Sequence, residues 1–350
     1  MPDTGLSSSR LSEFADFGSN PGNLNAKSYI PDSYRKGAPL VVVLHGCTQN
    51  PSGYDHNSGW SHAADEHGFA LLFPEQQRAN NPNLCFNWFS RSDASRGSGE
   101  ALSIRQMVAE THARYGTDPA RVYVTGLSAG GAMAAVMLAT YPEVFAGGGI
   151  IAGLPFGTAQ SIPEAFDRMR GHGGPNADEL AEIVRSASTH DGPWPTLSIW
   201  HGSGDRTVDP SNAEDLVDQW RALHGATKNP SRTDSVGGYP HRVWCDAEGR
   251  EVIEEYVITG MGHGAPLSTV GKQSDEVAGP YMIEAGISST RQICRFWGLC
   301  DERISRTGEL AKLVDNKPRV ARSKQPSSHP LAGGITKTIE DALRSAGLMR

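Results

Sequence analysis

The chain has 350 residues, of which 38% are hydrophobic and 20% are charged, so it can bury one sizeable core and is expected to be soluble and globular. A formal charge of -7 gives no electrostatic reason to expect a nucleic-acid partner. No apolar run approaches the roughly 20 residues that a membrane span needs, which argues against a membrane partner. The beginning, MPDTGLSSSRLSEF, lacks the basic-then-apolar order of a signal peptide, so the sequence itself predicts a cytoplasmic or an already processed protein.

Strand and helix patterns alternate along the chain. Short, continuous apolar and β-branched runs predict strands at residues 38–46, 68–76 and 121–128, and helical spacing lies between them at 58–67 and 100–116. Further strands are expected at 145–155, 195–205 and 254–264, and residues 242–258 are typical of a hairpin with its turn at 246–249. This order predicts an α/β fold with a mostly parallel central sheet flanked by helices.

The composition changes after about Cys300. The segment 301–350 starts as a basic linker rich in Pro, Ser and Gly, without apolar periodicity. Near its end, four apolar side chains share one face and predict a short amphipathic helix: Ile335, Ile339, Leu343 and Leu348. We expect this helix to dock on its own domain, with binding to a partner or to an apolar polymer surface as the alternative. The chain thus divides into an N-terminal extension (1–16), a globular domain (17–300) and this tail.

Five cysteines leave at least one thiol unpaired, and none of them sits in a zinc-binding pattern, so no metal site is expected. Cys294 and Cys300 are close enough in sequence to close a small disulfide loop in an exported chain. Cys47 and Cys85 form a second candidate bridge. Buried free thiols are the alternative for all of them.

The segment GLSAG, residues 126–130, matches the pattern G-x-S-x-G between a predicted strand and an alanine-rich helix. In such a turn the flanking glycines keep Cβ atoms out of a crowded bend, and the serine hydroxyl is lifted clear of the sheet. The pattern alone arises often by chance in a glycine-rich chain. Its strand-to-helix context favours Ser128 as a nucleophile over a purely structural turn.

A serine hydroxyl needs a base, and the base needs a carboxylate to orient it. Asp205 follows one predicted strand and His263 follows the last, which gives the chain order Ser, Asp, His expected for this kind of hydrolase. Asp209 is the rival carboxylate, although it lies further out in its loop. His45 and His201 precede glycines at strand ends and are expected to shape loops by hydrogen bonding.

Two backbone amides are candidates for stabilising a negatively charged oxygen. Ala129 begins the helix after the predicted nucleophile, where its N–H and the helix dipole both favour an oxyanion. Cys47 follows the first strong strand, where this kind of fold supplies its second donor, and there the identity of the side chain matters little. Cys47 as a thiol nucleophile is the weaker alternative, because a complete serine set lies elsewhere.

Several spaced motifs together resemble the polyhydroxyalkanoate depolymerase family of esterases, relatives of feruloyl and acetyl xylan esterases. These motifs are LHGCTQ, FPEQQRANNPNLCFNWF, RGSGEALSIRQMV, YVTGLSAGGAMAAVMLATYPEVFAGGGIIAGLP, SIWHGSGDRTVDP and ITGMGHG. The similarity covers roughly residues 17–299. It implies an α/β-hydrolase catalytic domain over 17–300, and the family's serine, aspartate and histidine correspond to Ser128, Asp205 and His263.

The resemblance implies ester hydrolysis without a cofactor, on short-chain hydroxyacyl polyesters or related esters. It also implies an extracellular enzyme, although this sequence shows no signal peptide. No polymer-binding module is recognised after the catalytic region, which favours soluble or amorphous esters over a crystalline polymer. A feruloyl or acetyl xylan esterase is the alternative substrate class. A non-catalytic polymer-binding scaffold with the same fold is the alternative of another kind.

The substrate pocket is expected to be lined by apolar and aromatic side chains on the loops between the motifs. The candidates are Trp88, Phe89, Leu154, Pro155 and Phe156. Trp60 is the remaining aromatic candidate, with a place in the core as the alternative.

Overall fold

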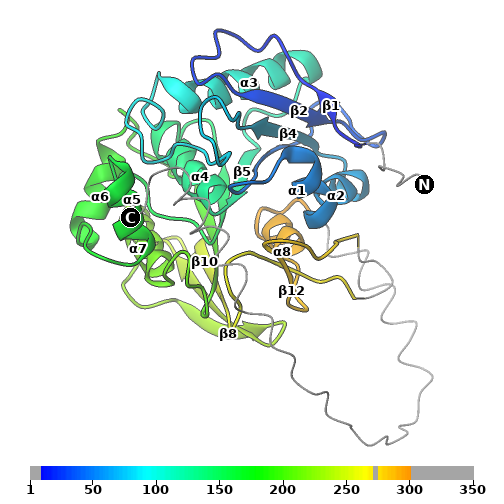
Figure 1. Ribbon diagram of the computed structural model, residues 1–350. Coiled ribbons are helices and arrows are strands. Elements are labelled where there is room, and N and C mark those ends of the chain that lie inside the picture. Colours follow the sequence, from blue (N-terminus) through cyan, green and yellow to red (C-terminus); the bar gives the residue numbers. More distant parts are fainter. Residues whose placement is uncertain (1–8, 271–274, 301–350) are drawn as a thin grey trace, which may run out of the picture.

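A computed structural model describes residues 9–270 and 275–300 of the chain, and a ten-stranded sheet runs through its centre (Figure 1). In spatial order the strands are β1 (Ser12–Glu13), β2 (Asn25–Tyr29), β4 (Ala70–Glu75), β3 (Leu40–Leu44), β5 (Val122–Leu127), β6 (Gly147–Ile151), β7 (Thr196–Gly202), β10 (Glu251–Ile258), β9 (Tyr239–Cys245) and β8 (Arg232–Val236). Neighbours from β4 to β10 pair in parallel, and the strands at both ends pair antiparallel. A small second sheet joins β11 (Ala265–Leu267) to β12 (Met282–Glu284).

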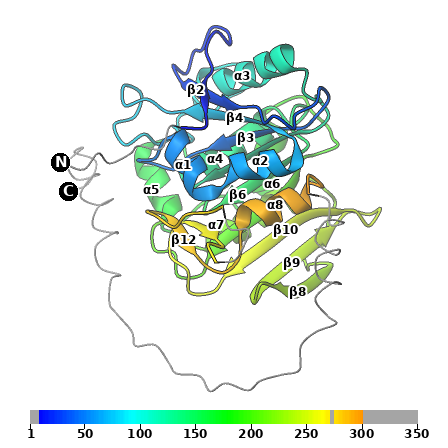
Figure 2. The same cartoon turned by 90° about the vertical axis from the view of Figure 1, so that its right-hand side faces the viewer.

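Helices cover both faces of the large sheet (Figure 2). One face carries α3 (Gly99–Tyr115), α4 (Ala129–Thr140), α5 (Ile162–Met169), α6 (Ala177–Arg185) and α7 (Ser211–Arg221). The other face carries α1 (Pro51–Ser58), α2 (Trp60–His67) and α8 (Ser289–Phe296). The helices bury two separate apolar layers against the sheet, which is the arrangement of an α/β hydrolase.

The side chains of β3 show why its sequence is a continuous apolar run. Leu40, Val42 and Leu44 belong to the core layer under α3 and α4. Val41 and Val43 belong to the opposite layer, because successive side chains of a strand point to opposite faces. All five residues are buried, as expected for a parallel strand that is covered on both sides.

The predicted α/β-hydrolase architecture is confirmed, and so is the hairpin near its end. The turn between β9 and β10 is closed by hydrogen bonds from the Asp246 N–H to the Arg250 carbonyl, at 3.0 Å, and from the Gly249 N–H to the Asp246 carbonyl, at 3.1 Å. The edge strands β1, β2 and β8 were not predicted from the sequence.

Part of the predicted N-terminal extension is described by the structure. Within it, β1 pairs with β2, and the side chains of Leu11 and Phe14 are buried in the core. Trp60 is also a core residue, stacked on Trp297. The predicted linker and helix of segment 301–350 lie outside the described residues, so their role stays a prediction. No helix within 9–270 or 275–300 combines the length and the apolar character needed to cross a bilayer.

The five cysteines adopt two different states. Cys47 and Cys85 form a disulfide, with their Cα atoms 4.2 Å apart. Cys245, Cys294 and Cys300 are free thiols, so the bridge considered between Cys294 and Cys300 is not formed in this structure. Instead the two thiols are hydrogen-bonding neighbours at the end of α8.

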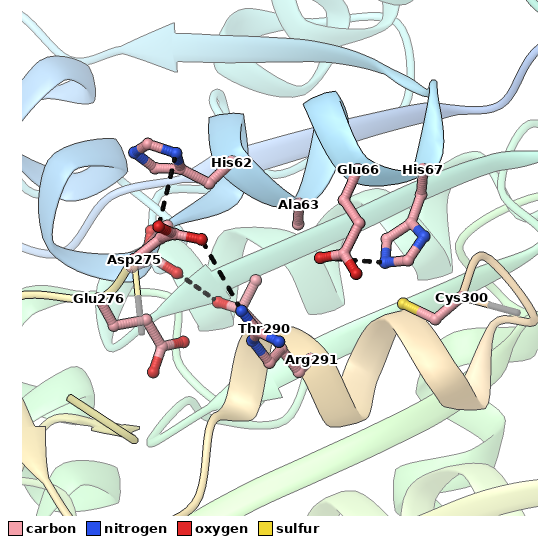
Figure 3. Close-up of a pocket in the computed structure, with 11 residues that line it drawn as sticks. His62, Ala63, Glu66, His67, Asp275, Glu276, Thr290, Arg291 and Cys300 are labelled. Atoms are coloured by element: carbon pink, nitrogen blue, oxygen red, sulfur yellow. Dashed lines mark hydrogen bonds and ion pairs between the residues drawn. The ribbon is translucent and has the colours of Figure 1, made fainter. Parts of the chain in front are cut away.

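Cys300 lies in a small pocket between α2 and α8, beside the His67 ring and the Glu66 carboxylate (Figure 3). A hydrogen bond from Cys294 lowers the pKa of the Cys300 thiol to about 6, with a further contribution from His67. Burial raises the pKa of the Cys294 thiol instead. A thiolate is the reactive form of cysteine, so the two thiols should differ strongly in reactivity.

We therefore predict that iodoacetamide at pH 7 alkylates Cys300 much faster than Cys294, because Cys300 is ionised and partly exposed while Cys294 is neutral and buried. Peptide mass spectrometry over a time course measures both rates. His67→Gln should slow the alkylation of Cys300. Equal rates at the two cysteines, or no effect of this variant, would contradict the assignment.

Candidate functional site

Ser128 occupies a sharp turn between β5 and α4. Its backbone has φ of +58° and ψ of -120°, an uncommon conformation for a residue with a side chain. The two flanking glycines are needed for packing. A Cβ atom on Gly126 would lie 2.3 Å from the carbonyl oxygen of Gly130, and one on Gly130 would lie 2.4 Å from the carbonyl oxygen of Leu44. The spacing of GLSAG therefore follows from how closely α4 approaches the end of β3.

Two further polar side chains meet Ser128 at the carboxyl ends of the parallel strands. His263 follows β10, and its Nε2 lies 2.9 Å from the Ser128 Oγ. Its Nδ1 lies 2.7 Å from Oδ2 of Asp205, which follows β7. Because a carboxylate can only accept, Nδ1 carries the proton and Nε2 is free to accept from the Ser128 hydroxyl. This edge of an open α/β sheet is where ligands bind in such folds.

The Asp205 carboxylate is buried and fully engaged. Its Oδ1 accepts from the N–H groups of Thr207, at 2.8 Å, and of Val208, at 3.0 Å. Its Oδ2 also lies 3.4 Å from Nε2 of His201. Burial alone would raise the pKa of Asp205, but the hydrogen bonds with His201 and His263 outweigh it and hold that pKa well below its usual range. Asp205 therefore stays ionised beside His263.

Asp209, the rival carboxylate in the sequence, is placed differently. Its Oδ1 accepts from the Ser211 N–H at 3.0 Å, at the start of α7. Among the contacts of the described residues, the His263 ring bonds to Asp205 and not to Asp209. The structure thus brings Ser128, His263 and Asp205 together and leaves Asp209 at the beginning of a helix.

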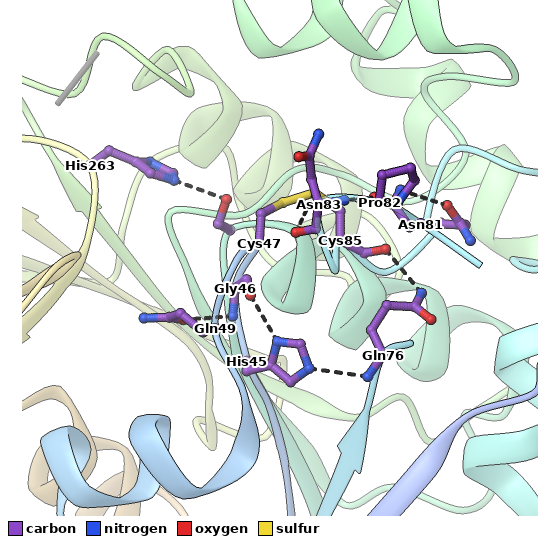
Figure 4. Close-up of a disulfide and its surroundings, with 12 residues drawn as sticks. His45, Gly46, Cys47, Gln49, Gln76, Asn81, Pro82, Asn83, Cys85 and His263 are labelled. Atoms are coloured by element: carbon purple, nitrogen blue, oxygen red, sulfur yellow. Dashed lines mark hydrogen bonds between the residues drawn. A yellow bond between two sulfur atoms is a disulfide. The ribbon is translucent and has the colours of Figure 1, made fainter. Parts of the chain in front are cut away.

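The loop after β3 lines the same cleft as Ser128, and His45 holds this loop by hydrogen bonds (Figure 4). The His45 Nδ1–H donates to the Gly46 carbonyl at 2.8 Å, and Nε2 accepts from the Gln76 N–H at 3.2 Å. The Gly46 N–H in turn donates to Oε1 of Gln49 at 2.8 Å. Burial lowers the pKa of His45 from its ordinary 6.5 to about 4, so the ring is neutral and can accept from the Gln76 amide.

Cys47 and Ala129, whose backbone N–H groups are the predicted oxyanion donors, both line the same cleft as Ser128. Within the described part of the chain, neither of these two N–H groups donates a hydrogen bond. Ala129 is the first residue of α4, where the helix provides no internal acceptor. The Cys47–Cys85 disulfide ties the first of these amides to the loop that follows β4.

The cleft above Ser128 has a volume of about 540 Å³, and its surface is mostly apolar. Of the predicted pocket residues, Trp88, Phe89 and Leu154 line it, whereas Pro155 and Phe156 do not. Both backbone groups of Phe156 bond to the side chain of Gln219 in α7, at 3.0 and 2.9 Å. Phe156 therefore fastens a loop to α7 rather than facing the cleft.

A buried carboxylate anchors the wall of the cleft that contains Trp88. Glu100 accepts hydrogen bonds from the backbone and side-chain amides of Asn87, each at 2.8 Å, and from the Gln76 side chain at 2.6 Å. Burial raises the pKa of Glu100 to about 7.

Within the described ranges, no group of three or more His, Cys, Asp or Glu side chains is arranged to hold a metal ion.

The family of this chain follows from its similarity to known proteins. Residues 25–235 match the family described as Esterase PHB depolymerase. The chain belongs to the PHB depolymerase family of esterases. It is a carboxylic ester hydrolase with an α/β-hydrolase fold.

Relatives of this esterase differ in the substrates that their names give. It is 45% identical to Poly(3-hydroxyalkanoate) depolymerase C of Paucimonas lemoignei over 83% of this chain and 70% of that protein. It is 29% identical to Feruloyl esterase B of Talaromyces stipitatus over 73% of this chain and 72% of that protein. The solved acetyl xylan esterase from Aspergillus awamori superposes with a TM-score of 0.69 at 25% identity, covering 83% of this chain and 99% of the other.

One whole wall of the cleft in this esterase was not predicted from the sequence. Helix α5 contributes four side chains to it: Ile162, Ala165, Phe166 and Met169. Their i, i+3, i+4, i+7 spacing in IPEAFDRM is the usual signal of an apolar helical face, opposite the charged Glu164, Asp167 and Arg168. That signal was present, but it does not say that this face covers a cleft. The polar rim from Asn80 to Asn83 was not predicted either, and neither was Tyr281, whose ring lies beside that of His263.

We predict that Gly130→Ala lowers stability by about 1–3 kcal/mol and reduces esterase activity, because the added methyl group overlaps the Leu44 carbonyl and displaces the Ser128 turn. Thermal unfolding and an ester assay measure both effects. Gly53→Ala, in the first turn of α1, is the matched control, since a Cβ there would have its nearest neighbour, the Asn50 Oδ1, at 3.5 Å. A Gly130→Ala protein as stable and active as the wild type would contradict this packing.

We also predict that His45 makes the esterase less stable in acid. Its pKa is lower in the folded chain than in the unfolded one, so its contribution is complete above pH 6.5 and is lost as the pH falls towards 4. The loss amounts to about 3 kcal/mol for this buried ring. Urea unfolding from pH 7 to 4 should therefore show a shallower decline for His45→Gln than for the wild type.

His241→Gln is the control with the opposite sign. Burial lowers the pKa of His241, but the hydrogen bonds with Glu254 and Asp234 raise it by more, so the net shift of this pKa is upward. Its stabilising contribution is present below the unfolded value and is lost as the pH rises. Parallel pH profiles for His45→Gln and the wild type would refute the role given to His45.

Proposed function

We propose that the chain is a serine esterase that hydrolyses short-chain polyhydroxyalkanoates or their oligomers through an acyl-enzyme. The observation that carries the proposal is the 2.9 Å contact between His263 Nε2 and Ser128 Oγ at the edge of an apolar cleft. A base within hydrogen-bond reach, itself held by a carboxylate, is the arrangement that activates a serine hydroxyl.

The first half of the reaction forms the acyl-enzyme. His263 removes the proton of Ser128 as Oγ attacks the ester carbonyl carbon, and Asp205 stabilises the imidazolium that results. The N–H groups of Cys47 and Ala129 donate to the oxyanion of the tetrahedral intermediate, and each such donor contributes on the order of 3 kcal/mol. His263 then gives its proton to the leaving alcohol. In the second half, water attacks the acyl group with His263 again as the base.

The substrate class is supported by the apolar cleft and by the relative with the highest identity reported above. Side chains of Trp88, Leu154 and Phe166 suit the alkyl groups of a hydroxyacyl chain, and the polar rim from Asn80 to Asn83 suits its ester oxygens. The name of the 45% identical relative gives a poly(3-hydroxyalkanoate) as its substrate. A feruloyl or acetyl xylan esterase is the second candidate, supported by the relatives with those names.

We predict that Ser128→Ala lowers ester turnover by a factor on the order of 10⁶, and that Asp205→Asn lowers it by about 10⁴, because the first removes the nucleophile and the second imposes the wrong imidazole tautomer. The assay compares p-nitrophenyl acetate and butyrate, amorphous polyhydroxybutyrate and methyl ferulate. Ser235→Ala, on the exposed edge strand β8, is the control.

Serine-dependent release of hydroxybutyrate is the result expected for a depolymerase. Serine-dependent activity on ferulate or on simple esters alone would keep the mechanism and move the substrate to the second candidate. Full activity of Ser128→Ala would reject the assignment of the nucleophile.

A further inference from the structure

Tyr281 occupies a turn whose backbone conformation disfavours a large side chain. Gly279 and Met282 exchange two backbone hydrogen bonds of 2.9 and 3.0 Å around Pro280 and Tyr281. Tyr281 has φ of +62°, at the turn position that type II turns normally give to glycine or asparagine. A bulky residue in this region persists only where its surroundings hold it, and such residues cluster at functional sites.

The surroundings of the turn fix it against the loop that carries His263. The Tyr281 carbonyl accepts from the Ala265 N–H at 2.8 Å, and β11 pairs with β12 through Ala265 and Met282. The approach is so close that a Cβ atom on Gly264 would lie 2.6 Å from the Tyr281 carbonyl oxygen. The two segments are therefore held tightly against each other, although fifteen residues lie between Ala265 and Tyr281 along the chain.

The Tyr281 side chain borders the cleft next to His263. Its ring meets the His263 ring edge to face, with centroids 6.1 Å apart and an interplanar angle of 75°. It lines the cleft together with Ser128 and is only partly buried. Within the two described ranges, the Tyr281 hydroxyl has no hydrogen-bond partner. Inside a protein a tyrosine hydroxyl usually finds a partner, so this one is available to a molecule in the cleft.

We propose that Tyr281 is a substrate-binding residue for the alcohol portion of the ester. This inference rests on the proposed function, in which His263 hands its proton to the leaving alcohol. The alcohol must therefore lie on the His263 side of Ser128, which is the side that Tyr281 borders. The ring contacts the alkyl part of the next hydroxyacyl unit, and the hydroxyl donates to an ester oxygen of that unit.

A purely structural role explains the position less well. Glycine at residue 281 would adopt the same turn without strain, and the hydroxyl holds no other described part of the chain in place. Tyr239 shows the contrast nearby, because its hydroxyl donates to the Ala285 carbonyl at 2.7 Å and so ties β9 to the segment after β12.

The test compares two ester bonds with the same 3-hydroxybutyryl acyl part and different alcohols: the bond of methyl 3-hydroxybutyrate, and the inter-unit bond nearest the hydroxyl end of the methyl ester of the linear 3-hydroxybutyrate trimer. For Tyr281→Gly we expect kcat/KM to fall about tenfold further on the trimer than on the methyl ester, mainly through KM. Tyr281→Phe keeps the ring and should show only a few-fold difference. The Tm of Tyr281→Gly should change little, because relief of the positive φ offsets the lost packing of the half-buried ring.

Tyr239→Phe is the matched control, which should lower Tm without changing the ratio between the two substrates. If Tyr281→Gly lowered kcat/KM equally on both substrates, so that the ratio of the two kcat/KM values stayed unchanged, the proposal would be overturned. Failure of the proposed function shows differently, as full activity of Ser128→Ala. If the wild-type enzyme hydrolyses only acetate esters, the two substrates become methyl acetate and an acetylated xylo-oligosaccharide. The ratio of their kcat/KM values in Tyr281→Gly and in the wild type then decides the role of Tyr281.

Discussion

The close approach of α4 to the end of β3 is the constraint on which the rest of the site depends. Both elements are buried, and they come together at Gly130, where no Cβ atom fits against the Leu44 carbonyl. This contact sets the sharp turn at Ser128 and places the first amide of α4 beside the loop after β3. A serine hydroxyl and two N–H donors are thereby brought to one edge of the sheet by backbone packing, without help from surface side chains.

Buried polar groups then fix what the backbone leaves free. Asp205 holds His263, His45 holds the loop after β3, and Glu100 holds the wall that contains Trp88. Each of these groups is buried and hydrogen-bonded, and an unpaired group there would be strongly destabilising. The order of the site therefore comes from satisfied hydrogen bonds behind it, whereas the cleft itself remains mostly apolar and open to an uncharged ester.

The sequence predicted those parts of the site whose reasons are local. The turn at Ser128 depends on neighbouring glycines, and the segments around Asp205 and His263 follow strong apolar strands, so each left a pattern. The α5 wall left a pattern too, but an apolar helical face facing a cleft looks the same in sequence as one packed in a core. Edge strands such as β2 are short and only partly buried, which weakens their signal. The place of Tyr281 depends on pairing between β11 and β12, and no pattern in the local sequence predicts this pairing.

The Cys47–Cys85 disulfide links the two sides of the cleft into a closed covalent ring. The two cysteines lie 38 positions apart in the sequence, and the segment between them contains α1, α2 and β4, which contribute to the hydrophobic core. One sulfur belongs to Cys47, whose amide is the proposed oxyanion donor, and the other belongs to the segment leading to Trp88. An insertion or deletion between Asn80 and Phe89 would therefore shift that amide as well as the wall. Under the proposed mechanism, one bond therefore joins a residue that acts on the chemical rate to the wall that acts on the choice of substrate, so that a change in this segment affects both.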